Sequence, residues 1–172
     1  MPRRLPDRVD ALRRAEQGVD LCGHIALARM PRLTGALCDR EGEAYAELRF
    51  DRDLQGIRFI AGRVAARLRM TCQRCLEPME VRVERELMLG LVRTESEAER
   101  LPAEYEPLLV GSAPLAIAEA VEDELILGLP LVALHAEGEH CPVRTPYRAG
   151  DDDARRHGEG PFAVLERLKR GH

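Results

Sequence analysis

The chain has 172 residues, a formal net charge of −4 and a pI near 5.8. This length suffices for one domain that buries about two thirds of its unfolded surface, and the acidic balance argues against a stand-alone nucleic-acid-binding domain. The longest apolar run, residues 125–134, contains Gly128 and Pro130 and is too short to cross a bilayer. Five cysteines and an Arg-rich N-terminus without a signal sequence predict a soluble cytoplasmic protein with reduced thiols and no membrane partner.

Charge is distributed unevenly along the chain. Residues 1–93 hold more arginines than acids, residues 94–160 are strongly acidic, and Lys169 is the only lysine. Guanidinium groups suit bidentate contacts with phosphate. The codon usage of a GC-rich genome would give the same preference for arginine, so both interpretations are open.

The first 93 residues are predicted to be rich in β-strand. Apolar residues at helical spacing predict a short helix within residues 5–18, and alternation of apolar and polar residues then predicts the strands. The expected strands cover residues 19–30, 43–50, 57–60, 62–70 and 81–92. Gly62 is expected to form a bulge or a sharp bend. Because the connections are too short for crossover helices, the predicted fold class is α+β, an antiparallel β-meander of about five strands covered by N- and C-terminal helices.

Residues 94–142 are predicted to form an acidic connector followed by a helix around residues 117–127. Ile117, Val121 and Leu125 recur at helical spacing and are expected to face the core. Three acids are expected on the solvated face of this helix, where they can meet a basic partner: Glu119, Glu122 and Asp123. Catalytic carboxylates or a magnesium site are the alternatives, which are less favoured because a run of acids on a helix is usually solvated.

The C-terminal part of the chain divides into two predicted segments. Residues 143–160 offer few apolar side chains to bury and are expected to be disordered. Residues 161–172 are predicted to form a C-terminal helix whose Phe162, Leu165 and Leu168 face inward. All of these segments are expected to belong to a single domain, 1–172.

A C-x2-C motif at residues 72–75 lies between two predicted strands, so it is expected at the tip of a hairpin. Thiols with this spacing can hold zinc together with two further ligands. The predicted ligands of one structural zinc ion are Cys72, Cys75, Cys141 and one of the two histidines His135 and His140. The alternative is that the thiols only pack. A thioredoxin-like redox role is disfavoured, because that motif belongs at a helix N-terminus in a βαβ unit.

Arginines alternate with apolar residues in the strand predicted at residues 62–70, so they are expected on one face of it. The candidate binding residues are Arg63, Arg67, Arg69 and Arg74, of which the first three are called the basic stripe. The stripe is predicted to contact RNA phosphates or another partner. The alternative is that it only pairs with Glu84 and Glu86 across the hairpin.

No common catalytic or cofactor-binding motif occurs in the sequence. It contains no G-x-S-x-G, P-loop, G-x-G-x-x-G or H-E-x-x-H pattern. Three Phe, three Tyr and no Trp are too few for the stacking platforms of proteins that bind single-stranded nucleic acids. The chain is therefore predicted not to be an enzyme, and to have no small-molecule substrate and no cofactor other than the zinc ion.

Several stretches taken together resemble the YceD family. They are residues 72–75, 101–107, 121–130, 135–141 and 161–165 with 168–169, in this order along the chain. Two positions depart from the family pattern, Ala133 where proline is common and Gly160 where asparagine is usual, and neither affects the thiols.

The resemblance implies a non-enzymatic ribosome biogenesis factor that promotes the synthesis, processing or stability of large-subunit (23S) ribosomal RNA. The implied partners are the precursor of that RNA, ribosomal proteins or assembly proteins. The alternative is a protein-only adaptor that binds a basic ribosomal protein or an assembly factor through its acidic helix.

Overall fold

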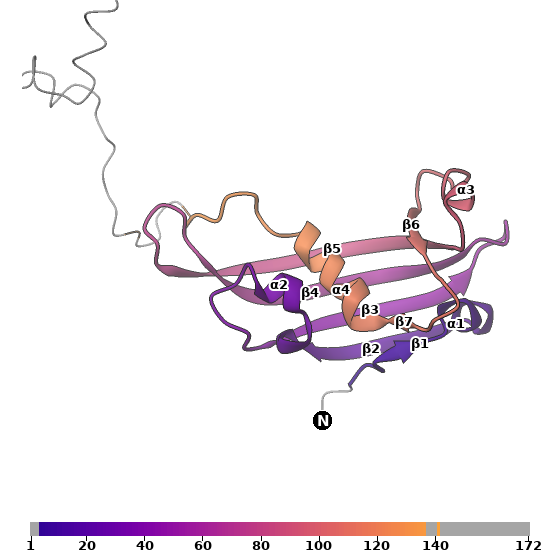
Figure 1. The fold of residues 1–172 in the computed structure, drawn as a ribbon, viewed down its shortest axis with the longest axis horizontal. Coiled ribbons are helices and arrows are strands. Elements are labelled where there is room, and N and C mark those ends of the chain that lie inside the picture. Colours follow the sequence, from indigo (N-terminus) through magenta and orange to yellow (C-terminus); the bar gives the residue numbers. More distant parts are fainter. Residues whose placement is uncertain (1–3, 137–140, 142–172) are drawn as a thin grey trace, which may run out of the picture. The chain divides into compact units, whose positions relative to one another are not determined.

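The computed structural model describes residues 4–136 and Cys141. Residues 4–136 lie within one compact unit, Met1–Glu139, whereas Cys141 belongs to a second unit, His140–His172. Figure 1 shows the helices and strands of the described residues, and these elements lie in the first unit. Three predictions concern residues outside this description: the disordered segment 143–160, the C-terminal helix 161–172 and the candidate ligand His140.

The first unit is an α+β fold built on one five-stranded sheet, as predicted. The strands of this sheet, in spatial order, are β2 (Val19–Ala26), β3 (Glu43–Arg52), β4 (Arg58–Thr71), β5 (Pro78–Val92) and β6 (Glu106–Leu109). Neighbouring strands are antiparallel except β5 and β6, which are parallel. Two short strands, β1 (Arg8–Val9) and β7 (Leu115–Ala116), pair antiparallel in a small sheet of their own.

Helices lie between the strands and after the last of them. They are α1 (Ala11–Gln17), η1 (Leu27–Arg29), α2 (Pro31–Thr34), α3 (Glu95–Ala98) and α4 (Ile117–Leu127). Asp10 caps α1 by accepting a hydrogen bond from the backbone N–H of Arg13 at 3.0 Å, and Gly18 ends the helix in the left-handed conformation. The helix predicted within residues 5–18 is therefore present but shorter. Among the described helices, none is long and apolar enough to cross a membrane.

Gly62 lies inside a continuous strand, so the prediction of a bulge or bend there is wrong. β4 pairs Gly62 with Leu48 of β3 and with Leu87 of β5, and both ladders continue unbroken on either side. A Cβ atom at this position would lie 1.9 Å from the carbonyl oxygen of Glu47, so the close approach of the two strands requires glycine. The two strands predicted around Gly62 are one strand, and the parallel β6 takes the fifth place in the sheet.

Helix α4 packs on one face of the sheet (Figure 1). Its residues Ile117, Val121 and Leu125 are buried, as predicted. They pack in one core with the inner face of the sheet, whose buried residues include Leu48, Phe50, Ile60, Val64, Ala66, Leu68, Val83, Leu87 and Leu89. Burial of each large apolar side chain contributes about 1.5 to 3 kcal/mol, so this contact is a main source of stability. Helix α1 also packs against β3 and β4, so part of the predicted cover comes from the N-terminus.

Glu122 of α4 is buried, which corrects the prediction that it lies on a solvated face. Its carboxylate accepts hydrogen bonds from the backbone N–H groups of Arg32 at 2.6 Å and Leu33 at 2.9 Å, in α2. The Arg32 guanidinium donates to the same carboxylate from Nε at 3.1 Å and from Nη2 at 3.0 Å. A buried carboxylate is tolerated only with such partners. Arg32 is 90 positions away in the sequence, so helical periodicity does not reveal this contact.

Glu124 is the second buried carboxylate of α4, and its partner is Arg85 of β5, with 3.2 Å between Nε and Oε2. Burial raises the pKa of Glu124, and the hydrogen bond from Arg85 opposes this shift. Asp123 remains exposed and pairs with Arg32 at 2.6 Å. Helix α4 is thus held to α2 and β5 by charged side chains as well as by apolar packing.

The substitution Glu122→Gln is expected to lower the free energy of unfolding by about 1.5 to 3 kcal/mol, because hydrogen bonds to a buried charged acceptor are lost. The matched control is Glu119→Gln on the exposed face of the same helix, which should change it by no more than about 0.5 kcal/mol. Urea unfolding of both variants measures the difference. Equal losses in the two variants would mean that the Glu122 carboxylate does not hold α4 to α2.

Candidate metal centre

The C-x2-C motif forms the tip of the hairpin between β4 and β5, as predicted. The backbone N–H of Cys72 donates to the carbonyl of Glu77 at 2.9 Å, and the N–H of Leu76 donates to the carbonyl of Cys72 at 2.8 Å. Leu76 adopts a φ of 63°, in the left-handed region that residues other than glycine rarely enter. These bonds close a tight turn in which the two thiols stand three positions apart.

The segment that follows α4 lies against this tip. The backbone N–H of Gln73 donates to the carbonyl of Ala133 at 2.8 Å, and Ala133 is buried. The Arg74 guanidinium donates to the carbonyl of His135 at 3.2 Å. As a result the His135 ring reaches the second thiol, with 3.4 Å between Nδ1 and the Sγ of Cys75.

The Cys72 thiol is fully buried, and its surroundings favour the thiolate. Burial alone would raise its pKa, but hydrogen bonds from the backbone N–H groups of Cys75, His135 and Arg74 outweigh that effect. Together with a bond from the Cys75 side chain they lower the pKa of Cys72 from 9.0 to about 5. The thiolate is the form of cysteine that binds metals.

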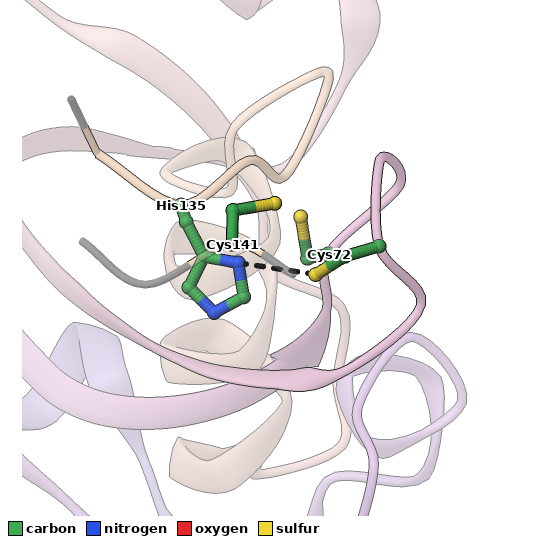
Figure 2. A group of neighbouring side chains, drawn as sticks. Cys72, His135 and Cys141 are labelled. Atoms are coloured by element: carbon green, nitrogen blue, oxygen red, sulfur yellow. Dashed lines mark hydrogen bonds between the residues drawn. The ribbon is translucent and has the colours of Figure 1, made fainter. Parts of the chain in front are cut away.

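Four donor atoms meet at this tip. The ligand atoms of Cys72, Cys75, His135 and Cys141 all lie within 4.8 Å of one another, and Figure 2 shows three of these residues labelled. Three of the four belong to the unit Met1–Glu139. In a tetrahedral zinc site the sulfur and nitrogen donors stand about 3.5 to 3.8 Å apart, as the usual bond lengths require. The donor set and its spacing therefore fit a metal ion.

The cluster contains Cys72, Cys75 and Cys141 together with one of the two candidate histidines, His135. The other, His140, lies outside the described residues. The signals in the sequence were the C-x2-C spacing and a second Cys–His group. Metal binding itself stays a prediction.

The basic stripe has the exposure that alternation predicts, because Arg63, Arg67 and Arg69 are all exposed. The alternative, in which the stripe pairs with Glu84 and Glu86 across the hairpin, does not match the ion pairs of the described residues. Arg63 pairs with Glu47 of β3 at 3.1 Å, and Arg69 pairs with Asp39 at 2.9 Å. Both acids lie in the chain before β4, and the alternation within one strand gave no sign of them.

The stripe lies on the outer face of the sheet, defined here as the strand residues that point away from the core. The acids of this outer face are Asp20, Glu43, Glu47, Asp51, Glu80, Glu84 and Glu86. Its arginines are Arg49, Arg63, Arg67, Arg69 and Arg82. Acids therefore outnumber arginines there. Two further arginines are paired within this face, Arg49 with Asp51 and Arg82 with Glu84.

The predicted acidic face of α4 is smaller than expected. Glu122 is buried against α2 and Asp123 pairs with Arg32, which leaves Glu119 exposed without an ion pair among residues 4–136 and Cys141. Two of the three acids therefore have structural partners within the fold.

These features define a class of protein: an α+β fold on one main sheet with a Cys3His donor set at a hairpin tip. A family model described as "Large ribosomal RNA subunit accumulation protein YceD" matches residues 60–169. A protein of that description from Haemophilus influenzae is 33% identical over 171 residues, which cover 96% of this chain and 97% of the relative. The chain therefore belongs to the YceD family. No solved structure matches it.

Protein treated with a chelator is expected to lose stability as the pH falls from about 9 to about 5, because the pKa of Cys72 is lowered from 9.0 to about 5 on folding. The pKa of Cys72 is lower in the folded protein than in the unfolded chain. The thiolate therefore contributes fully to the free energy of unfolding above the unfolded pKa, and this contribution is lost below the folded pKa. Urea midpoints across this pH range measure it. Cys72→Ser should flatten the dependence and Cys22→Ser, on an exposed cysteine, should keep it. The same slope in both variants would contradict the assignment.

Proposed function

We propose that this protein is a non-enzymatic factor in biogenesis of the large ribosomal subunit, acting in the cytoplasm on the synthesis, processing or stability of 23S ribosomal RNA. The observation that carries the proposal is the family match over residues 60–169, which includes β5, α4 and all four donors of the metal cluster. The Haemophilus influenzae relative, whose name describes large ribosomal RNA subunit accumulation, aligns with 96% of this chain.

The proposed partners are the precursor of the large-subunit RNA and the ribosomal or assembly proteins bound to it. The proposed contact surface is the outer face of the sheet together with Arg74 of the hairpin tip, and its candidate cations are Arg63, Arg67, Arg69 and Arg74. Arg67 supports this choice, because it lies opposite Arg82 in the ladder and has no ion pair among residues 4–136 and Cys141. A partner that carries acidic or phosphate groups would neutralise this pair.

A second candidate function is a protein-only adaptor that holds a basic ribosomal protein or an assembly factor. The observation that favours it is the excess of acids on the outer face of the sheet. The helix α4 would contribute Glu119 and Asp123, while Glu122 is committed to α2. Cross-linking in cells separates the two functions, because the first gives cross-links to precursor RNA and the second to proteins alone.

Substitution of the basic stripe by Arg63→Gln, Arg67→Gln and Arg69→Gln is expected to reduce the association of the tagged protein with large-subunit precursor particles at low salt. The physical reason is the loss of three exposed cations from the proposed contact surface. Sedimentation of cell extracts on sucrose gradients measures the bound fraction. The matched control replaces three exposed arginines outside the sheet, Arg29, Arg40 and Arg100. Equal retention of both variants removes the stripe from the contact surface, and the absence of wild-type protein from these particles refutes the function.

We infer that the cluster holds one structural zinc ion through Cys72, Cys75, His135 and Cys141. Three thiolates and one imidazole fill a tetrahedral site completely, so the ion would have no open position for a substrate. This supports a structural role, in which the ion fixes the hairpin tip to the chain after α4. The inference agrees with the proposal that the protein is not an enzyme.

Protein purified without chelator is expected to contain about one zinc ion per chain, and Cys72→Ser is expected to release it and lower the melting temperature, because metal binding and folding are linked. Elemental analysis and thermal unfolding measure the two effects, with Cys22→Ser as the control. His135→Ala should also release zinc whereas His140→Ala should not. Folded protein with well under one zinc per chain would show that the thiols only pack.

A further inference from the structure

A cleft of about 510 Å³ lies beside α1, away from the metal cluster. One wall is α1 with β1 before it, and the other is the chain from Leu109 to Ala116, which includes β7. Ligand pockets for small molecules or nucleotides have volumes of about 300 to 1,000 Å³. The cleft is therefore large enough for one phosphate-bearing group.

Three guanidinium groups from separate elements line this cleft: those of Arg8 in β1, Arg13 in α1 and Arg93 just after β5. The Arg8 guanidinium donates to the carbonyl of Pro114 at 3.3 Å, which holds it at the edge of the cleft. For Arg13 and Arg93 the hydrogen bonds to acids come from the backbone N–H, to Asp10 and Glu97. None of the three guanidiniums forms an ion pair with an acid among residues 4–136 and Cys141.

Two of the three acids that line the cleft are already engaged. Asp10 caps α1, and Glu16 lies between Arg52 and Arg58, with N to O distances of 3.6 and 3.5 Å. Glu119 has no ion pair within the described residues. Because Arg52 and Arg58 pair with Glu16, the three arginines of the cleft face only two further acids, Asp10 and Glu119. The cleft therefore has an excess of positive charge.

The hollow on the outer face of the sheet differs in this respect, although its volume of about 680 Å³ is larger. The arginines that line it are Arg49, which pairs with Asp51, and Arg63, which pairs with Glu47. Asp20 and Glu86 add further negative charge. Both arginines of the hollow are thus already paired with acids, and Arg67 does not line it, so the larger volume alone does not make the hollow an anion site.

We infer that the cleft beside α1 binds a phosphate group through Arg8, Arg13 and Arg93. Guanidinium groups offer paired N–H donors that match the oxygens of phosphate, and they remain charged at every physiological pH. A strand of RNA or a free nucleotide can supply the phosphate. The inference that RNA supplies it rests on the function proposed above, and the binding site itself does not.

The first arm of the test measures the affinity for a labelled single-stranded RNA of about 20 nucleotides by fluorescence anisotropy over a series of salt concentrations. The combined substitution Arg8→Gln, Arg13→Gln and Arg93→Gln is expected to weaken binding about tenfold at low salt and to reduce the slope of log affinity against log salt by about 2, as three lost phosphate contacts require. The control with Arg29, Arg40 and Arg100 replaced by Gln removes the same charge elsewhere. Equal weakening by the two triple variants would overturn the site.

A second variant tests the site in the opposite direction. Glu119→Gln removes the acid that has no ion pair, so RNA should bind a few-fold more tightly to this variant than to the wild-type protein. Both sets of substitutions are at exposed positions, and circular dichroism checks that the variants are folded. No gain in affinity for Glu119→Gln would count against the cleft even if the triple variant were poorly folded.

The second arm uses inorganic phosphate and AMP, each titrated alone and as a competitor of the labelled RNA. Competition with RNA that is lost in the triple cleft variant supports the site with RNA as its ligand. AMP binding without any RNA binding supports the site with a free nucleotide as its ligand. If neither RNA nor phosphate nor AMP binds, the site is refuted, while association with large-subunit precursor particles would still support the proposed function.

Discussion

The position of α4 is the constraint on which the rest of the structure depends. The backbone N–H of Ile117 at its start donates to the carbonyl of Asp7 at 3.2 Å, and Glu122 in its middle holds the backbone of α2. The chain that leaves it binds the hairpin tip through the bond from Gln73 to Ala133. One helix thereby brings a wall of the cleft to β1 and brings His135 to the thiols. A shift of α4 along the sheet would disturb both places at once.

Much of the sheet could be predicted from the sequence, because alternation is a local property of each strand. The exceptions have nonlocal causes. Gly62 looked like a break, yet it is required because the neighbouring strand at Glu47 approaches its Cα too closely for a side chain. The parallel pairing of β6 with β5 depends on the return path of the connector, which no alternation encodes. Glu122 looked solvated because its partner Arg32 is far away in the sequence.

The metal cluster was predictable for a different reason. A C-x2-C turn carries its own geometry, since the two thiols of Cys72 and Cys75 are close wherever the turn lies. His135 is brought to them by backbone bonds, namely the one that Ala133 accepts and the one from the Arg74 guanidinium to the carbonyl of His135 itself. The acceptors of these bonds are backbone carbonyl groups, which every residue has, so no pattern of residue types indicates them. The sequence could therefore indicate the kind of cluster and two candidate histidines, but not the contact that brings His135 to the thiols.

Charge was the least predictable property, because the sequence does not show which charges are already paired. The basic stripe was visible as alternation, but Glu47 and Asp39 neutralise two of its three arginines. The guanidiniums of Arg8, Arg13 and Arg93 come from three separate elements, and only the fold brings them to one cleft. The net charge of −4 therefore gives no measure of phosphate binding, since several acids in the sum, among them Glu122 and Glu16, are occupied within the fold. What a polyanion meets is a local group of cations without ion pairs, and among the described residues these include Arg67 on the outer face and the three arginines beside α1.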